Sequence, residues 1–380
     1  MPLCNSYDGL YLFWYQLYFN MGLKQFFKDL SASPTVLPYL VEIKDSHVLN
    51  GQADDSDLGK LDPGQHYFTV KVNEMFLSQQ RQWFIKIEPM VICLTSYQYG
   101  SAEIDNPFIV GTNLLNSKIQ NVPPGMVFRD TRVAGIHPFS GGRFVLGIVL
   151  CQSQSGNLLK DAIGFIEKVS GLLSENIKAL VGSYAAIATT IIGGIDNLLN
   201  SKQIEPLFGF RKEFDADSKE GFSGGYYLMI DKSAKGIDFE KFFVKNNRLC
   251  YGQDIDSASP YVDVQNLAKS EYVLFSITKS DTRSDFKTLP VYQSYNKILE
   301  ELKGTSEVST DHKEKIKGKL RVLNIEMRQS PDLTEKDAKS LMEKFVKEVS
   351  ELIDPKYNFG LAPVLAEDDW SRLDKSIANL

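Results

Sequence analysis

The sequence has few of the residues that usually carry metal-dependent chemistry. Its 380 residues include four histidines and four cysteines, and neither set contains a Cys-x-x-Cys or a His-x-x-x-His pair. Zinc sites in proteins are built from ligands at such close spacing. The short acidic strings of the chain also lack the order of acids and glycine that defines a calcium-binding loop. The sequence therefore predicts no metal and no cofactor.

The few cysteines also indicate a cellular compartment. Cys93, Cys151 and Cys250 lie in or beside apolar runs, where a reduced thiol packs as a small apolar group, and Cys4 stands alone near the start of the chain. The sequence contains no Asn-x-Ser/Thr glycosylation signal. We therefore expect reduced thiols and a cytoplasmic protein, at most peripheral to a membrane.

The chain lacks an excess of positive charge. Its formal net charge is −6, whereas general nucleic-acid binding depends on clustered lysine and arginine that neutralise phosphates. One basic run, Lys313 to Arg321, places five cations within nine residues. Residues two apart do not share a face of a helix, so this run predicts a solvated surface. We expect no general nucleic-acid binding.

No apolar run reaches the roughly 20 residues that a membrane-spanning helix needs. Two uncharged stretches come nearest, the aromatic segment within 1–21 and the segment 179–195. In the second, small residues recur every four positions and would allow another helix to approach closely, namely Gly182, Ala186 and Thr190. A membrane-acting effector that uses both stretches is therefore one hypothesis; another is that the natural chain starts at Met21.

Alternating apolar and polar residues predict antiparallel strands. Phe68, Val70 and Val72 would face one side of a half-buried strand. The run MVICLTSY, from Met90 to Tyr97, is apolar on both faces, as a central strand would be. The following segment, 113–136, contains the run Pro123, Pro124 and Gly125 and is predicted to be a connecting loop. More strands are expected at 143–151, 206–214, 226–230, 242–251 with a turn at Asn246-Asn247, and 272–278.

Helical spacing of apolar residues appears twice. The segment 156–200 predicts an inserted αα-hairpin, and the region 291–380 predicts further helices near 292–302, 311–327 and 337–353. Thr334 is expected to cap the last of these, with Asp337 in the capping-box position. In the tail, Trp370, Leu373 and Ile377 recur at helical spacing, and they could dock on the protein's own body or on a partner.

These patterns predict an α+β protein with a mostly antiparallel β-rich body, an inserted αα-hairpin and a helical C-terminal region. The expected divisions are an aromatic extension, a β-rich domain, an α+β domain that contains the hairpin, and the helical region with its tail: 1–21, 22–135, 136–290 and 291–380.

The tetrapeptide FSGG occurs twice, at Phe139 to Gly142 and at Phe222 to Gly225. A dinucleotide-binding loop would stand between a strand and a helix, whereas both copies here precede a predicted strand. We interpret the two glycine pairs as turn residues that let the chain enter the next strand.

One short motif is compatible with hydrolysis. Glu42 and Lys44 stand two residues apart, so they would share a face of a strand, as in metal-dependent nucleases. A second acid at suitable spacing is missing, and a surface ion pair on an edge strand is the simpler interpretation.

Because the chain shows no compact set of reactive residues, we expect contact surfaces to carry its function. The leading hypothesis is a non-enzymatic protein-binding or assembly subunit of an intracellular complex, through a protein partner or self-association. The residues predicted to make these contacts are Trp370, Leu373, Ile377, Gly182, Ala186 and Thr190. The alternatives are the membrane-acting effector and a metal-dependent hydrolase that uses Glu42 and Lys44.

Overall fold

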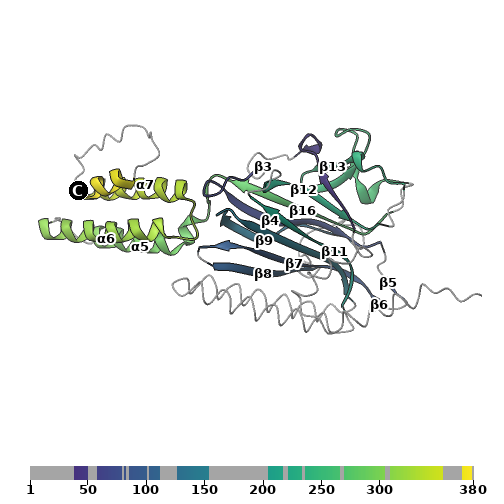
Figure 1. The fold of residues 1–380 in the computed structure, drawn as a ribbon, viewed down its shortest axis with the longest axis horizontal. Helices are drawn as coiled ribbons and strands as arrows, with labels where there is room; N and C mark the ends of the chain where they lie inside the picture. Colours follow the sequence, from purple (N-terminus) through teal and green to yellow (C-terminus); the bar gives the residue numbers. More distant parts are fainter. Residues whose placement is uncertain are drawn as a thin grey trace, which may run out of the picture.

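The computed structural model shows a mixed α+β protein, as predicted, with a β body and a helical domain at one end of it (Figure 1). The structure describes residues 38–49, 58–78, 81–82, 85–100, 102–111, 126–153, 204–216, 221–232, 236–265, 269–303, 309–353 and 370–378. The predicted aromatic extension 1–21 and the predicted αα-hairpin 156–200 lie outside these residues.

The β body is built around a central sheet with the strand order β1-β12-β16-β4-β9. All of its strand pairs are antiparallel, and β3 pairs with β12 beside this path. Its strands are β1 (Tyr39–Ile43), β12 (Ser223–Ile230), β16 (Tyr272–Ser280), β4 (Tyr67–Phe76), β9 (Met126–Pro138) and β3 (Gly59–Lys60).

A second antiparallel sheet has the order β11-β10-β7-β8. It consists of β11 (Ile204–Asp215), β10 (Arg143–Ser153), β7 (Glu88–Tyr99) and β8 (Ala102–Gly111). The apolar run from Met90 to Tyr97 lies in β7, which has a neighbour on each side, so its prediction as a central strand is confirmed.

A small sheet has the order β15-β14-β13-β2, and β5 and β6 form a separate short pair. The hairpin between β13 and β14 turns at Asn246 and Asn247, whose φ angles of 49° and 62° confirm the predicted turn. The remaining strands are β2 (Val48–Leu49), β5 (Arg81–Gln82), β6 (Ile85–Lys86), β13 (Phe242–Lys245), β14 (Arg248–Tyr251) and β15 (Ser259–Pro260). The short 3-10 helices are η1 (Asp45–His47), η4 (Phe239–Lys241), η5 (Tyr261–Asp263) and η6 (Phe286–Thr288).

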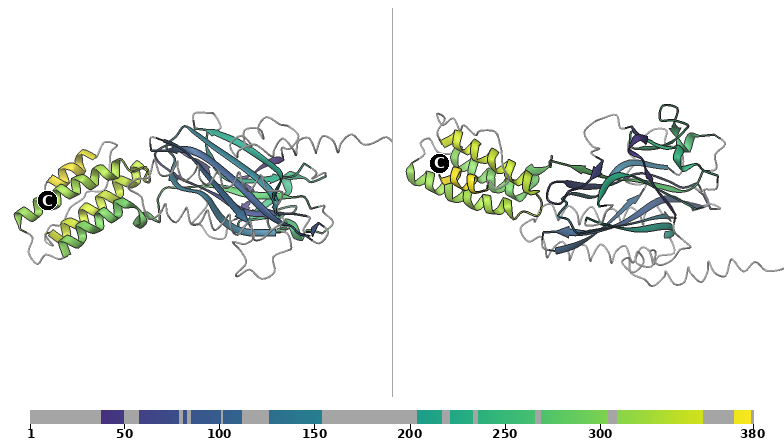
Figure 2. Two further views of the ribbon diagram at one scale, coloured as in Figure 1. Left: turned by 90° about the horizontal axis from the view of Figure 1, so that it is seen from below. Right: turned by 45° about the horizontal axis from the view of Figure 1, so that its top comes forward.

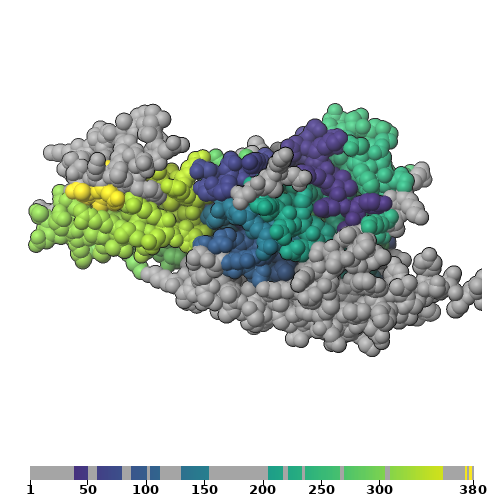
Figure 3. All heavy atoms as spheres, in the orientation of Figure 1, coloured from purple at the N-terminus to yellow at the C-terminus, as the bar shows by residue number. Residues whose placement is uncertain are grey.

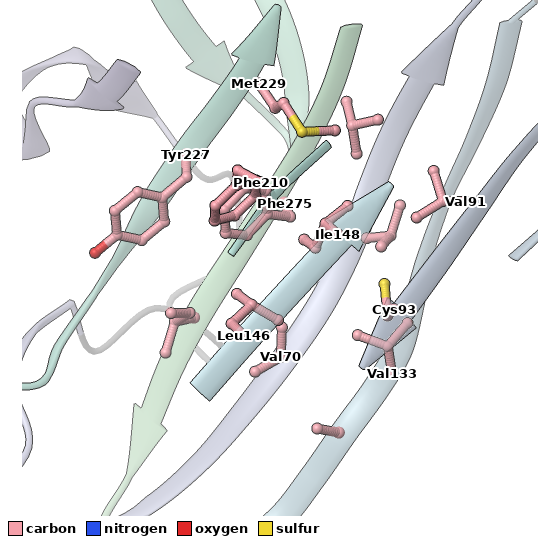
Figure 4. Packing of buried hydrophobic residues seen from close by; sticks show 14 of the residues in the cluster. Val70, Val91, Cys93, Val133, Leu146, Ile148, Phe210, Tyr227, Met229 and Phe275 are labelled. Carbon is pink, nitrogen blue, oxygen red and sulfur yellow. The ribbon is translucent and has the colours of Figure 1, made fainter. Parts of the chain in front are cut away.

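The central sheet lies between the other two, because its two faces belong to different apolar cores. Tyr227, Met229 and Phe275 pack with residues of the second sheet, whereas Tyr226 and Leu228 pack with residues of the small sheet. Figure 4 shows the first core: the rings of Tyr227, Phe275 and Phe210 lie together beside aliphatic side chains of the second sheet. Burial on both faces explains why β12 and β16 are nearly continuous apolar runs.

A one-residue bulge in β4 changes which side chains face each core. Phe68, Val70 and Val72 face the second sheet, in agreement with the predicted alternation. Beyond them the register with β16 skips one residue, so that Val72 and Glu74 are paired with adjacent residues of β16. After this bulge Met75 continues the first core, and Glu74 turns toward the small sheet.

Several local predictions need correction. Residues 126–136 belong to strand β9 rather than to a loop, since β9 pairs with β4 from Met126 to Pro138, with several register irregularities. The expected boundary between residues 135 and 136 therefore falls inside β9, and the central sheet combines strands from both sides of that boundary.

The two FSGG segments differ in structure. Gly141 and Gly142 have φ angles of 87° and 71° just before β10, as expected of turn residues. In the second copy, Ser223 and Gly224 already lie in β12 and pair with β3. The positive φ angle there belongs to Gly221, at 64°. Turn chemistry therefore accounts for the first copy, and the prediction was wrong for the second.

The helical domain comprises α5 (Pro290–Lys303), α6 (Thr310–Arg328), α7 (Glu335–Ile353) and α8 (Trp370–Ala378). These helices share an apolar core that is separate from the cores of the β body. In two further views the domain stands beyond the end of the sheets (Figure 2). The three longer helices begin and end within about two residues of the predicted ranges.

The β body is joined to the helical domain by a side chain of β4. The Thr334 hydroxyl accepts the Asp337 N–H at 3.2 Å, which confirms Thr334 as the cap of α7. In a complete capping box the Asp337 carboxylate would accept the Thr334 N–H directly. Here the Tyr67 hydroxyl lies between the two groups. It accepts the Thr334 N–H at 3.0 Å and donates to Asp337 at 2.8 Å. Tyr67 thus completes the capping box from another element.

Candidate protein-binding surfaces

The predicted contact residues of the tail lie in α8. Leu373 and Ile377 are 4% and 0% exposed and belong to the core of the helical domain. The tail therefore docks on the protein's own helices, against α6 and α7. Trp370 is the first residue of α8, and its side chain lies outside the described part. Gly182, Ala186 and Thr190 also lie outside the described residues.

A polar clamp fixes α8 in the groove between α6 and α7. The Asn324 side-chain amide donates to Asp374 at 2.7 Å, and the Arg328 guanidinium donates to the other carboxylate oxygen at 3.0 Å. Both donors belong to α6. Figure 3 shows α8, in yellow, at the surface of the helical domain. Sequence periodicity pointed to the apolar anchors Leu373 and Ile377, but nothing in the sequence linked Asp374 to Asn324 and Arg328.

A second groove runs between α5 and α6 and has a cavity of about 340 Å³. Its floor is apolar, with Ile298 and Leu323, and Val322 at its side is 56% exposed. Ile325, three residues further along α6, is 53% exposed. The complete lining is Ser294, Lys297, Ile298, Lys315, Gly318, Lys319, Val322, Leu323 and Glu326. Exposed apolar residues beside a cavity are typical of contact surfaces.

Three lysines give this groove a basic character. Lys315 and Lys319 of α6 both bind Glu301 of α5, the first at 2.7 Å. Their hydrogen bonds, that of Lys315 first, lower the pKa of the Glu301 carboxyl to about 2, so this acid stays ionised and ties the two helices together. Lys297 on the α5 side makes no ion pair within the described residues. The Lys315 and Lys319 side chains remain 64% and 40% exposed, so this part of the basic run lies at the solvated surface, as predicted, while it pairs with α5.

The β body contains a buried acid that sequence reasoning missed. Glu74 is 1% exposed; the Leu249 N–H donates to it at 2.8 Å, and the Tyr272 hydroxyl donates to its other oxygen. Burial raises the pKa of the Glu74 carboxyl from 4.5 to about 7, although these donors and nearby Arg248 oppose the shift. The bulge that redirects Glu74 is defined by the pairing of β4 with β16, so no pattern within the sequence of β4 identified this acid as buried.

His137 lies in β9 within a set of aromatic rings. Its ring is 5.1 Å from Tyr97, 5.5 Å from Tyr99 and 6.1 Å from Phe68. Burial, and then the positive charge of Arg283, lower the pKa of His137 to about 3. The imidazole is therefore neutral at physiological pH and packs as an aromatic ring rather than serving as a general base.

The stretch from Gly221 to Gly225 reads GFSGG and so matches the spacing of a nucleophile elbow, Gly-x-Ser-x-Gly. An elbow serine stands on a sharp turn from a strand into a helix. Ser223 instead begins strand β12 and pairs with Lys60 of β3. Among the described residues no hydrogen bond joins the Ser223 side chain to a histidine. The motif therefore lacks its structural context here.

The Glu42-x-Lys44 pair lies at an edge of the central sheet. Glu42 is in the edge strand β1, and Lys44 binds Glu240, with 59% and 69% of the two side chains exposed. Within the described ranges, no group of three histidine, cysteine, aspartate or glutamate side chains could hold a metal ion. Cys93, Cys151 and Cys250 are buried and form no disulfide.

No helix in the part of the chain that the structure covers is both long and apolar enough to cross a membrane. No protein-family model, curated protein or solved structure matches this chain.

Proposed function

We propose that this protein is a non-enzymatic protein-binding or assembly subunit of a multiprotein complex and that its helical domain is the binding module. The groove between α5 and α6 carries this proposal. It combines an apolar floor, exposed apolar side chains and lysines at its sides, which is the composition of a contact surface rather than of a reaction centre.

The exposed side of α6 supports this proposal. Leu320, Leu323 and Met327 already fill the core of the domain, so Val322 and Ile325 form a second apolar stripe on the same helix. The nearby Gly318 has no side chain, and an added Cβ would meet no atom within 4 Å. The backbone of α6 is therefore accessible to another chain at that point.

The charges of the groove, and the way in which the same domain holds α8, indicate the kind of partner that fits it. Because Glu301 already pairs with Lys315 and Lys319, Lys297 is the lysine of the lining that can pair with an acidic side chain of a partner, and Glu326 is the one acid of the lining. The same domain already holds α8 through two apolar anchors beside an aspartate. The proposed occupant is therefore an amphipathic helix of another protein that places acidic residues beside its apolar face.

The experiment compares the full chain with a Val322→Asp and Ile325→Asp double variant as baits in quantitative affinity purification from the native host. A partner that uses this groove should be lost from the double variant, because each change places an unpaired charge in an apolar contact. A synthetic helix taken from that partner should bind the purified chain and lose affinity when Lys297→Glu is introduced.

Leu352→Asp is the matched control, since Leu352 is also exposed, at 44%, but lies on α7 outside this groove. It should retain the partner. If the double variant and the control recover the same proteins as the unaltered chain, the groove is not the binding surface and the proposal fails.

A further inference from the structure

α8 is held by the helical domain in the way that a ligand helix is held in a groove. Its 9 residues are too few to form a stable helix alone in water, so contacts with α6 and α7 maintain it. Leu373 and Ile377 are one helical turn apart and enter the core, where they are 4% and 0% exposed. Apolar anchors four residues apart are the usual means by which an amphipathic helix engages a partner groove.

The polar contacts make this groove selective. Asp374 lies next to Leu373, and it accepts hydrogen bonds from Asn324 and Arg328. Asn324 is 1% exposed, and its carbonyl oxygen has no hydrogen-bond partner within the described residues. A buried asparagine at a helix interface restricts partner and register, because a helix without an acceptor there leaves the amide unpaired. The groove therefore favours the pattern Leu-Asp-x-x-Ile.

Every copy of the chain carries a helix with this pattern. Residues 354–369 separate α7 from α8 in the sequence, and 16 residues can span at most about 55 Å when extended. The contacts in the groove are the same whether α8 comes from its own chain or from another one, so exchange requires no new interface. A tether of this kind gives α8 an effective concentration on the order of 1 mM. In dilute solution α8 therefore docks on its own chain. Docking on a second copy becomes more populated where copies are concentrated in an assembly.

We infer that the groove between α6 and α7 is a binding site for α8 of a second copy, and that two chains join by exchanging this helix. The inference rests on the proposed function, assembly through the helical domain. It concerns a different groove from that between α5 and α6 and can be tested on the purified chain alone.

Two full-length variants test the exchange. In the donor, Asn324→Asp and Arg328→Asp make the groove repel its own Asp374 and leave α8 intact. In the acceptor, Leu373→Asp and Ile377→Asp prevent α8 from docking and leave the groove intact. Each variant alone should have the mass of one chain, 42.8 kDa, by size-exclusion chromatography with light scattering. Neither variant has both an intact groove and an intact α8, so neither can dock its own helix. In an equimolar mixture the α8 of the donor should dock in the groove of the acceptor and form a complex of one donor and one acceptor.

A charge-reversal control makes the test specific. Adding Asp374→Lys to the donor lets α8 pair with its own altered groove, so this triple variant should remain a single chain in the mixture. Circular dichroism first establishes that donor and acceptor are both folded. The inference is overturned if they then remain separate at about 0.1 mM, which is within about tenfold of the effective concentration of the tethered α8. Val322→Asp with Ile325→Asp should leave the exchange intact, so the two proposals can fail independently.

If the variants lose their helical content, a measurement on the unaltered full chain decides. A fluorescein-labelled peptide of residues 366–380 should bind the chain in competition with the chain's own α8, as followed by fluorescence anisotropy. The same peptide with Asp374→Lys should bind about tenfold more weakly, since the Asn324 amide and Arg328 lose their acceptor. Equal binding of the two peptides, or binding of neither, would refute the exchange site.

Discussion

A single residue, Glu74, shows how a local change in strand register creates a titratable group inside the β body. Without the bulge in β4, the alternation of Phe68, Val70 and Val72 would continue and Glu74 would face the second sheet. The bulge directs it toward the small sheet instead, where the Leu249 N–H and the Tyr272 hydroxyl bind it. The two donors satisfy the carboxyl oxygens, but burial still favours its protonated form.

This raised pKa predicts a pH dependence of stability. The pKa is about 7 in the folded protein against 4.5 as the ordinary value, so between these values the folded state binds more protons than the unfolded state. The contribution of Glu74 to stability is therefore complete below pH 4.5 and is lost as the pH rises through 7, by roughly 3 kcal/mol. Glu74→Gln should remove this dependence, as measured by urea unfolding at several pH values between 5 and 8.

The quantity to compare between the variant and the unaltered chain is the change in unfolding free energy with pH, not the unfolding free energy at a single pH. Gln has one acceptor oxygen, so the variant loses a hydrogen bond at every pH. Glu300→Gln, on the outer side of α5, is the control and should follow the unaltered chain. A Glu74→Gln variant that retained the full decrease in stability between pH 5 and 8 would contradict the assignment.

At the scale of elements, β9 depends on a close approach that only glycine permits. A Cβ at Gly135 would stand 2.3 Å from the Phe68 carbonyl oxygen and 2.9 Å from the Thr69 Cα. Both atoms belong to the backbone of β4, and the φ angle of Gly135 is 93°. β9 can therefore pair with β4 here only where the side chain is absent.

Gly135→Ala should consequently cost more than about 3 kcal/mol of unfolding free energy, because backbone cannot move aside as a flexible side chain can. Gly142→Ala is the matched control: its φ angle is also positive, but an added Cβ meets no atom within 4 Å, so only roughly 1 to 2 kcal/mol of conformational strain is expected. Urea unfolding of both variants checks the difference. If both variants lose the same unfolding free energy, the close approach of Gly135 to the backbone of β4 does not require a glycine.

At the scale of the whole molecule, two parts with separate apolar cores are joined through polar contacts. The Tyr67 hydroxyl links β4 to the start of α7. Beside it, the Arg283 side chain binds Asp285 at 2.6 Å and the Asp332 carbonyl at 3.0 Å, and Tyr99 donates to Asp332 at 2.8 Å. Because hydrogen bonds depend on direction, this junction fixes how the helical domain stands relative to the sheets.

Tyr67→Phe tests how strongly the two parts are coupled. It leaves the Thr334 N–H and one Asp337 oxygen without this partner, at a cost of about 1 to 3 kcal/mol. The two parts should then unfold in more clearly separated transitions in differential scanning calorimetry. Tyr39→Phe, at a ring that is 42% exposed, should unfold as the unaltered chain does. If both variants unfold alike, the Tyr67 hydroxyl does not couple the two parts.

The sequence by itself determined the elements whose pattern is local. The alternation from Phe68 to Val72, the apolar β7, the Asn246-Asn247 turn and the spacing in α5 to α7 follow from rules that act within a few residues. The mixed α+β class follows from these elements. Leu373 and Ile377 could be identified as an apolar stripe for the same reason, since helical spacing is a property of neighbouring residues.

Only the tertiary structure decided the features that join distant segments. β9 was mistaken for a loop because the prolines and glycine that precede it, together with Gly135, conceal a strand whose pairing with β4 is non-local. The clamp of Asn324 and Arg328 on Asp374, the burial of Glu74 and the groove between α5 and α6 each combine side chains from different elements. The periodicity of apolar residues within one element indicates which of its faces is buried. Which other element packs against that face depends on tertiary packing.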